Sequence, residues 1–186
     1  MGVAIGDIDN DDDLDVYITN YGKDALYLNN ADGTFINITD RSGIDNPSWA
    51  CPAAFLDYNL DGYLDIYVAN YVDYDTSVHC FDLSGTPEYC GPASFLGSKD
   101  VLYRNNGDGS FTDVSTDSGI DKKNKKGLGL VTTDVNDDGY PDIYVANDRE
   151  ENILWMNQKN GTFKDTAMLM GIAVNQSGAR EAGMGI

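Results

Sequence analysis

One short pattern occurs three times along the chain and constrains its fold more than any other feature. Each copy is an acidic loop of nine residues, in which Asp or Asn alternates with other residues: DIDNDDDLD from Asp7, DYNLDGYLD from Asp57 and DVNDDGYPD from Asp134. A Val-, Ile- and Tyr-rich segment follows each loop (VYITN, IYVAN, IYVAN) and predicts a β-strand. A unit that recurs in this way indicates a repeat protein.

A second series of segments alternates with the acidic loops. Its members are LYLNNADGTFINIT from Leu26, LYRNNGDGSFTDVS from Leu102 and LWMNQKNGTFKDTA from Leu154. Each predicts a strand, a tight Asp-Gly or Asn-Gly turn and another strand, because Gly adopts positive φ at little cost. With the short apolar segment before each acidic loop, every repeat has four strands, as in a propeller blade. The predicted fold is all-β: a β-propeller fragment of about three four-stranded antiparallel blades.

The repeats divide the chain into three predicted blades. The first covers 1–50, the second 51–126, and the third 127–186 together with the start of the next. The second and third acidic loops are further apart than the first and second, which predicts an insertion at about 71–97. Three blades rarely close a ring. We therefore expect the remaining blades of a longer chain, or else copies of this chain, to complete it, with the longer chain favoured.

The alternating positions of each acidic loop predict a calcium site. Positions one, three, five and nine offer side-chain oxygens, and position seven offers its backbone carbonyl. Ca²⁺ takes six to eight such oxygens at about 2.3–2.6 Å, so about three Ca²⁺ ions are expected. The predicted ligands are Asp7, Asp9, Asp11, Asp13 and Asp15 in the first loop, Asp57, Asn59, Asp61, Tyr63 and Asp65 in the second, and Asp134, Asn136, Asp138, Tyr140 and Asp142 in the third.

Position six of each loop requires a sharp turn. Gly62 and Gly139 suit it, whereas the first loop has Asp12. Asp tolerates the left-handed region less well than Gly, so we expect the first site to be intact but weaker or more strained.

The acidic loops allow three interpretations other than a calcium site of a propeller blade. An EF-hand needs flanking helices and a bidentate Glu at position twelve, but that position is Ile18, Val68 and Val145, each within a predicted strand. Mg²⁺ is less favoured because it requires rigid six-fold geometry and retains waters. The aspartates could also serve only to cap turns, which remains the alternative to metal binding.

The charge balance limits the classes of partner. The sequence has 12 Lys and Arg against 31 Asp and Glu, a formal net charge of −19. Such a field repels nucleic acid, so no nucleic-acid partner is expected. No run of about 18 apolar residues is present, and neither membrane insertion nor a signal peptide is predicted.

The three cysteines leave two interpretations open. Cys80 and Cys90 flank a short irregular loop, and a disulfide between them would imply an oxidising compartment. Zinc binding by Cys51, His79, Cys80 and Cys90 is less favoured, because the paired spacing of zinc sites is missing. Cys51 itself lies in a predicted strand, where we expect a buried thiol.

The acidic loops and the NNADGTF, NNGDGSF and NQKNGTF segments resemble the FG-GAP/VCBS repeat family, whose calcium-binding blades are similar to those of the integrin α-subunit propeller. The segment YCGPASF followed by LYRNNGDGSFTDVS is similar to secreted proteins of the ASPIC-associated group. The resemblance covers almost the whole chain. It implies an extracellular, cell-surface or periplasmic propeller with structural Ca²⁺, and roles in adhesion or ligand binding. Asp12 departs from the family pattern.

The sequence favours a binding module over an enzyme. No Gly-x-Ser-x-Gly elbow or phosphate-binding Gly loop is present. Two alternatives remain: the propeller part of a polysaccharide lyase, and a structural spacer without a partner. A lyase would need a basic, aromatic-lined groove, but aromatic residues are absent around the basic cluster of Lys122, Lys123, Lys125 and Lys126.

The expected partner is a protein or glycan ligand, and the insertion is the candidate for contacting it, since propeller loops carry recognition. Its notable residues are Tyr74, His79, Phe81, Tyr89 and Phe95. Whether these side chains contact a ligand or pack onto their own blade stays open at this point.

Overall fold

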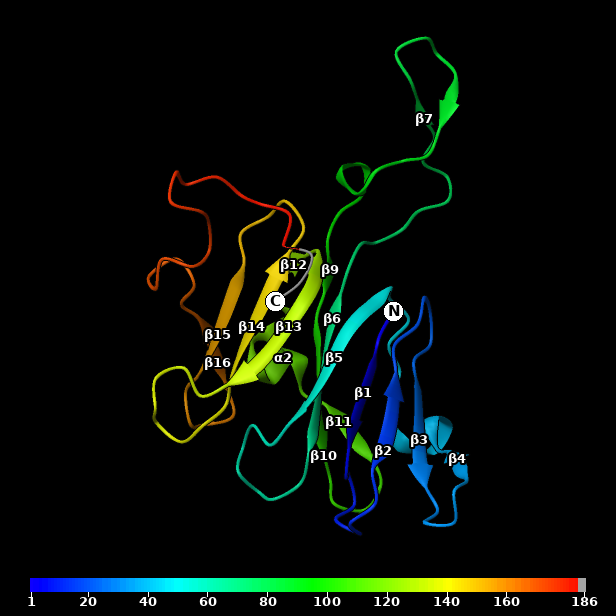
Figure 1. Cartoon of the computed structure of the whole chain (residues 1–186), viewed down its shortest axis with the longest axis vertical. Coiled ribbons are helices and arrows are strands. Elements are labelled where there is room, and N and C mark those ends of the chain that lie inside the picture. Colours follow the sequence, from blue (N-terminus) through cyan, green and yellow to red (C-terminus); the bar gives the residue numbers. More distant parts are fainter. Residues whose placement is uncertain (184–186) are drawn as a thin grey trace.

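The computed structural model describes residues 1–183 and consists mainly of three four-stranded antiparallel sheets (Figure 1). The first has the order β1 (Val3–Gly6), β2 (Asp15–Ile18), β3 (Ala25–Asn29) and β4 (Phe35–Asn37). The second has the order β5 (Ala50–Leu56), β6 (Asp65–Asn70), β10 (Val101–Asn105) and β11 (Phe111–Asp113). The third has the order β13 (Gly127–Thr133), β14 (Asp142–Asn147), β15 (Ile153–Asn157) and β16 (Phe163–Asp165). The predicted all-β propeller fragment is therefore confirmed.

Short elements join these sheets. A one-turn helix follows the fourth strand of the first two sheets: α1 (Thr39–Ser42) and α2 (Ser115–Ser118). The remaining elements are β7 (Cys80–Phe81), β8 (Pro87–Glu88), η1 (Pro92–Ser94), β9 (Ser98–Lys99), η2 (Ile120–Lys122) and β12 (Asn124–Lys125). Both α-helices end at a glycine in the left-handed region, Gly43 and Gly119. The sequence analysis did not predict them, because one turn is too short to leave a helical period.

The core lies between successive sheets. Every residue of β6 is buried, because the second sheet is covered on both faces. Ile66 and Val68 pack with Tyr17 and Leu26 of the first sheet. On the opposite face, side chains of the second and third sheets form a second cluster that includes Tyr67, Ala69, Leu102, Ile143, Val145 and Trp155. Each large apolar side chain buried in this way contributes about 1.5–3 kcal/mol, so the stacked sheets stabilise one another.

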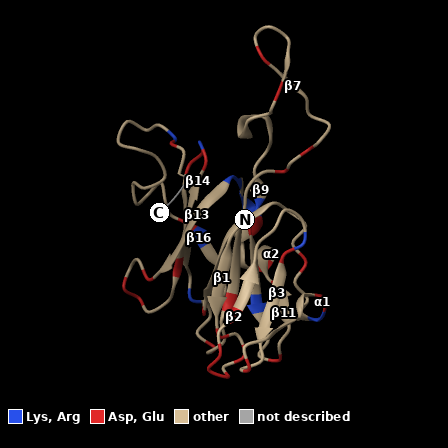
Figure 2. Cartoon of the chain, turned by 45° about the vertical axis from the view of Figure 1, so that its right-hand side comes forward, with Lys and Arg blue, Asp and Glu red and all other residues tan. Residues whose placement is uncertain are grey.

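The acidic loops and the insertion lie at opposite ends of the sheets. The loops connect β1 to β2, β5 to β6 and β13 to β14, at the lower end in Figure 1, where much of the ribbon is coloured red for Asp and Glu in Figure 2. The insertion leaves the upper end between β6 and β9 and contains the β7–β8 hairpin. A bridge between Val72 and Gly97 joins its two ends.

Within residues 1–183, no helix is long and apolar enough to cross a membrane. The predicted start of a further blade falls partly on residues 184–186, which lie outside the described residues. Just before them, Ala182 forms a bridge with Asp148, next to the end of β14.

Candidate metal sites in the acidic loops

The first aspartate of each acidic loop fixes the loop's curvature. Its carboxylate accepts hydrogen bonds from the backbone amides at positions five and six, which curl the chain around it. The bonds to Asp7 measure 3.2 and 3.0 Å, those to Asp57 3.1 and 2.9 Å, and those to Asp134 3.1 and 2.7 Å. Three segments of different sequence therefore adopt one loop conformation.

Two residues of each loop have positive φ. At position six the angle is 70° for Asp12 and 88° for both Gly62 and Gly139, as the sequence predicts for a sharp turn. The residue at position four also has positive φ, although it is never glycine: it is Asn10, Leu60 or Asp137. The sequence analysis missed this second position, because a leucine gives no signal for the left-handed region.

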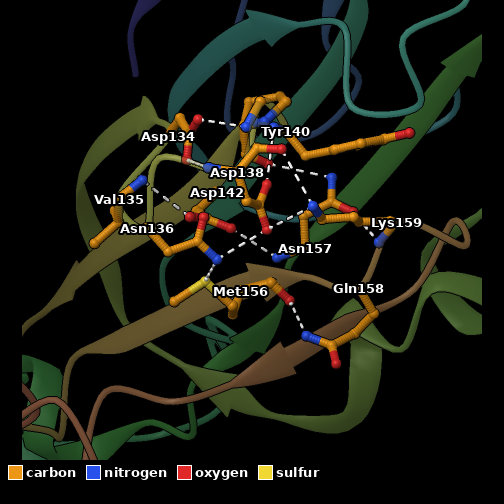
Figure 3. Close-up of polar contacts among 12 residues, drawn as sticks. Asp134, Val135, Asn136, Asp138, Tyr140, Asp142, Met156, Asn157, Gln158 and Lys159 are labelled. Atoms are coloured by element: carbon orange, nitrogen blue, oxygen red, sulfur yellow. Dashed lines mark hydrogen bonds and ion pairs between the residues drawn. The ribbon is translucent and has the colours of Figure 1, made fainter.

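The last aspartate of each loop is buried and anchored at both carboxylate oxygens. Asp15, Asp65 and Asp142 are at most 1% exposed. One oxygen accepts from the amide at position two, at 3.0–3.1 Å. The other accepts from the amide of the asparagine that ends the third strand, at 2.7–2.8 Å (Figure 3 shows the third loop). This aspartate therefore connects the loop to the hairpin beside it. Each of its carboxylate oxygens keeps a lone pair that could bind an ion.

The structure brings the predicted ligands together to different degrees. Ligand oxygens of Asp7, Asp9 and Asp15 lie within 4.8 Å of one another, the one such group of three or more acidic, His or Cys side chains among residues 1–183. In the other loops, the position-three asparagine donates to the carboxylate at position five: Asn59 to Asp61 at 2.8 Å, and Asn136 to Asp138 at 2.9 Å.

Positions five and seven are coupled in all three loops. The carboxylates of Asp11, Asp61 and Asp138 accept from the amides of Asp13, Tyr63 and Tyr140, at 2.9–3.0 Å. The side chains at position seven point elsewhere in the second and third loops: the Tyr63 ring lies against Gly107, and the Tyr140 ring lies 5.4 Å from the Lys159 ammonium. In the second and third loops, position seven can therefore serve an ion through its backbone carbonyl only.

Comparison with known proteins identifies the repeat. The family described as "FG-GAP-like repeat" matches residues 4–68, 81–145 and 134–181. The chain belongs to the FG-GAP-like repeat family. Cartilage acidic protein 1 of Xenopus tropicalis is 24% identical to it over 79% of this chain and 31% of its own length. The chain thus spans less than a third of that relative.

A solved structure supports the propeller fold of these FG-GAP-like repeats. It is the structure of a lectin of Agrocybe aegerita, described as showing the structural basis of that lectin's specific recognition of non-reducing terminal N-acetylglucosamine. It superimposes with a TM-score of 0.50 at 21% identity, over 87% of this chain and 37% of the lectin. At this identity the likeness concerns the fold alone.

An asparagine links each of the first two acidic loops to the next FG-GAP-like repeat. The Asn105 side-chain amide, in the second sheet, donates to the backbone carbonyl of Ile8 in the first loop at 2.7 Å. Asn157 in the third sheet donates to Tyr58 in the second loop at 2.8 Å. Sequence reasoning missed these bonds, although the asparagine recurs in NNADG, NNGDG and NQKNG. Any ion that orders one loop would therefore also order its contact with the neighbouring blade.

Charge repulsion is strongest in the first loop. Burial, followed by the charges of Asp11, Asp15 and Asp7, raises the pKa of Asp9. Burial also raises the pKa of Asp15, against the lowering effect of its two amide bonds. The like charges add to burial in both shifts, and the ligand oxygens of Asp7, Asp9 and Asp15 lie within 4.8 Å of one another. A cation bound at this point would be stabilised by these carboxylates.

The second and third loops differ electrostatically. Burial raises the pKa of Asp65 to about 7. In the third loop, the hydrogen bond from the Gly139 amide lowers the pKa of Asp134. Burial acts to raise the pKa of Asp138, but hydrogen bonds from the Tyr140 amide, Asn136 and Lys159 outweigh it and lower the pKa. The Lys159 ammonium lies 3.4 Å from the Asp138 carboxylate, so this loop has a cation of its own.

The structure divides the aromatic residues of the insertion into two groups. Tyr74 and Phe95 pack together at its base, with ring centroids 4.9 Å apart. Phe81 and Tyr89 lie at the β7–β8 hairpin and are 60% and 100% exposed. His79 is also exposed. Tyr74 is nevertheless 44% exposed, so packing at the base accounts fully for Phe95 alone, and ligand contact stays a prediction for the other four residues.

The cysteines and the basic cluster have structural partners. Cys80 and Cys90 form a disulfide, which removes two of the four candidate zinc ligands. Cys51 is a free, partly buried thiol in β5. In the basic cluster, Lys123 pairs with Asp165, Lys125 with Glu151 and Lys126 with Glu150. These acids offset the charge of three of the four lysines in the cluster.

Proposed function

We propose that this chain is the calcium-stabilised part of an extracellular β-propeller that binds a protein or glycan ligand and has no catalytic role. The observation that supports calcium best is the convergence of Asp7, Asp9 and Asp15 within 4.8 Å, in a loop conformation that occurs three times. Carboxylate, amide and carbonyl oxygens are the donors that Ca²⁺ prefers.

The role of calcium in this proposal is to join strands. Each acidic loop connects the first two strands of a blade, and its last aspartate holds the third strand. In the first two loops, an asparagine of the next blade also bonds to the loop. Ca²⁺ supplies positive charge among these oxygens when it is bound. Its binding free energy then adds to the free energy of unfolding.

Calcium removal tests this role. The intact chain is unfolded thermally with excess Ca²⁺, excess Mg²⁺ and excess EGTA, and bound metal is counted by mass spectrometry. We expect about three Ca²⁺ per chain and a melting temperature that is clearly higher in Ca²⁺ than in EGTA, with Mg²⁺ much less effective. Equal melting temperatures with no bound metal would leave the aspartates as turn caps, and the calcium proposal would be abandoned.

The extracellular location is supported by the disulfide between Cys80 and Cys90, because disulfides persist in oxidising compartments. The family and the lectin fold favour a binding module over an enzyme. Because the chain spans about a third of these relatives, the activity of the whole protein is part of the same proposal.

The insertion is the proposed contact with the ligand. Val72 and Gly97 are bridged, so deleting residues 73–96 leaves paired ends that a short Gly linker can join. We expect this variant to keep its calcium-dependent melting temperature and to lose ligand binding. Unchanged binding would exclude the insertion from recognition. A full chain that melts in a calcium-dependent way and binds nothing among proteins and glycans would favour a structural spacer.

A further inference from the structure

A pocket lined by aromatic rings lies at the end of the sheets opposite the acidic loops. It has a volume of about 310 Å³, near the lower limit of the range of on the order of 300–1,000 Å³ typical of small-molecule sites. Tyr21 follows β2 of the first sheet, Trp49 precedes β5 of the second, and Tyr74 begins the insertion. An antiparallel bridge between Tyr21 and Trp49 holds the two sheets together here. The pocket therefore joins two blades and the base of the insertion.

The three rings meet nearly at right angles. Their centroids are 5.6 Å apart for Tyr21 and Trp49, 6.0 Å for Tyr21 and Tyr74, and 5.9 Å for Trp49 and Tyr74. The interplanar angles are 83°, 80° and 89°. Tyr21 is 58% and Tyr74 44% exposed, so both tyrosines leave aromatic surface open to a ligand.

The polar side chains around the pocket have unused hydrogen-bonding capacity. They are the carboxylate of Asp73, the hydroxyls of Ser48 and Ser98, the phenol groups of Tyr21 and Tyr74, and the indole N–H of Trp49. None of these groups makes a hydrogen bond among residues 1–183.

The backbone around the pocket is fixed by hydrogen bonds. The amide of Asp73 donates to Leu96, that of Ser98 to Tyr71, and that of Gly22 to Ser48. Three paired backbone segments thus present polar groups that have no partner of their own, which is a preformed arrangement for a ligand.

Resting on the proposed function, we infer that this pocket binds one unit of a neutral glycan. A sugar ring has an apolar C–H face, which suits the open tyrosine surface, and hydroxyls around its edge, which suit the polar groups. Apolar packing with a few placed polar contacts is typical of ligand pockets. A quaternary ammonium ion would use the rings but leave the two serine hydroxyls and the indole N–H without partners.

Charge excludes the acidic sugars. Asp73 lies at the pocket, the chain has a formal net charge of −19, and three of the four lysines of the basic cluster are paired with acids. A sulfated or carboxylated sugar would be repelled by this field. The pocket is therefore selective for neutral sugars over anionic ones of the same size.

The alternative is that the rings only anchor the insertion. Phe95, 9% exposed and packed on Tyr74, serves that purpose directly. Tyr21 also contacts Tyr74, but it belongs to the first sheet and is mostly exposed, and its replacement by Ala leaves the packing of Tyr74 on Phe95 in place. Tyr21 is therefore the residue at which the two explanations give different results.

The experiment uses the full chain in excess calcium on an array of neutral oligosaccharides, with sulfated and sialylated versions of the same glycans and free choline as competitors. The strongest neutral glycan is then titrated by calorimetry against Tyr21→Ala, Ser98→Ala and Phe35→Ala, a matched control at an exposed aromatic residue of β4 outside the pocket and the insertion. We expect binding to the neutral set, no inhibition by choline, and at least about tenfold weaker binding for Tyr21→Ala. Ser98→Ala is expected to weaken binding several-fold and Phe35→Ala to leave it unchanged.

Three outcomes would overturn the inference: no neutral glycan binds, choline or the anionic glycans bind preferentially, or Tyr21→Ala binds as the parent does while keeping its melting temperature. These outcomes are distinct from failure of the proposed function. Calcium-dependent melting, and binding lost on deletion of residues 73–96 but kept in Tyr21→Ala, would retain a calcium-stabilised binding module and relocate its site to the insertion tip.

Discussion

The first and third acidic loops have the same backbone but opposite electrostatic character. Both are curled by the amides at positions five and six and anchored by a buried final aspartate. The first has six acids among its nine residues, whereas the third has four and contains Asn136 and Gly139 in place of two. The third also receives the Lys159 ammonium, at a position that is Ala31 in the first repeat.

Hydrogen bonds set the same conformation in both loops, and we expect charge to set how strongly each loop requires a cation. Burial and then the charges of neighbouring aspartates raise the pKa of Asp9, so folding without an ion works against both effects in the first loop. The pKa values of Asp134 and Asp138 are lowered in the third, so its carboxylates are already stabilised. We therefore expect the first blade to depend on calcium more than the third.

The contrast extends to the residue that precedes the third strand of each blade. Asp24 in the first blade and Asp100 in the second accept from the backbone amides of Asn20 and Asn70, at 2.7 and 2.9 Å. Each also accepts from a buried tyrosine hydroxyl. In the third blade, neutral Asn152 accepts from the Asn147 amide instead.

The largest loss of stability is expected from replacing the buried final aspartate, which anchors both loops in the same way. Replacing Asp15 or Asp142 with Ala leaves two backbone amides without an acceptor. An unpaired buried donor costs about 1–3 kcal/mol, so each variant should lose about 2–6 kcal/mol in urea unfolding with EGTA present. Asp13→Ala is the control within the first loop, because the side chain of Asp13 accepts no hydrogen bond among the described residues; it should change stability by less than about 0.5 kcal/mol. A loss of stability in Asp15→Ala but not in Asp142→Ala would show that the two aspartates do not anchor their loops equally.

The free energy of unfolding is expected to depend on pH through Asp24 and Asp100, the buried acids that Asn152 replaces in the third blade. Burial raises the pKa of Asp100 to about 7, although Tyr67 and Asn70 donate to it. A folded-state pKa above the unfolded value of about 3.9 means that the folded chain binds more protons between these values. The free energy of unfolding should therefore rise as pH falls from 7 to 5, by about 2–3 kcal/mol.

Asp100→Asn should flatten this dependence, because the neutral residue has no proton to gain. The exposed Asp117→Asn serves as the control and should keep the slope. Urea unfolding at pH 5, 6, 7 and 8 in excess calcium gives the comparison. A slope of the opposite sign, or one that Asp100→Asn leaves intact, would assign the pH dependence to other groups.

A reciprocal exchange of the lysine tests the electrostatic difference itself. Ala31 and Lys159 have nearly the same φ, 59° and 61°, so Ala31→Lys places an ammonium near the first loop with the backbone unchanged. A surface charge pair is worth at most about 1 kcal/mol. We expect calcium binding to weaken several-fold at the first loop in Ala31→Lys, and to strengthen by a similar factor at the third in Lys159→Ala. Calcium titration by calorimetry measures both, and unchanged affinities would mean that the lysine does not compete with the ion.

The sequence was sufficient for features that depend on local chemistry. The strands, the loop positions and the positive φ of Asp12 follow from side chains within a few residues of one another. Contacts between repeats could not be predicted: Asn105 reaches Ile8 only after two sheets have stacked. Lys159 gave no signal, because Ala31 and Gly107 occupy its place in the other repeats. The calcium ligands themselves remain a prediction, since side chains that converge on a point do not reveal what binds there.

The smallest expected effect concerns the turn at position six. Asp12 has φ of 70°, a conformation that costs an ordinary residue roughly 1–2 kcal/mol and aspartate less. Asp12→Gly removes this strain and one negative charge, while the added freedom of glycine in the unfolded chain offsets part of the gain. In EGTA we expect Asp12→Gly to stabilise the chain by about 0.5–1 kcal/mol. Gly139→Asp is the reverse change in the third loop, where no atom lies within 4 Å of the added Cβ, so steric clash does not contribute. It should destabilise by a similar amount in urea unfolding. If Asp12→Gly instead lowers stability only when calcium is present, the Asp12 side chain takes part in holding the ion, and the first site differs from the third in its ligands as well as in its charge.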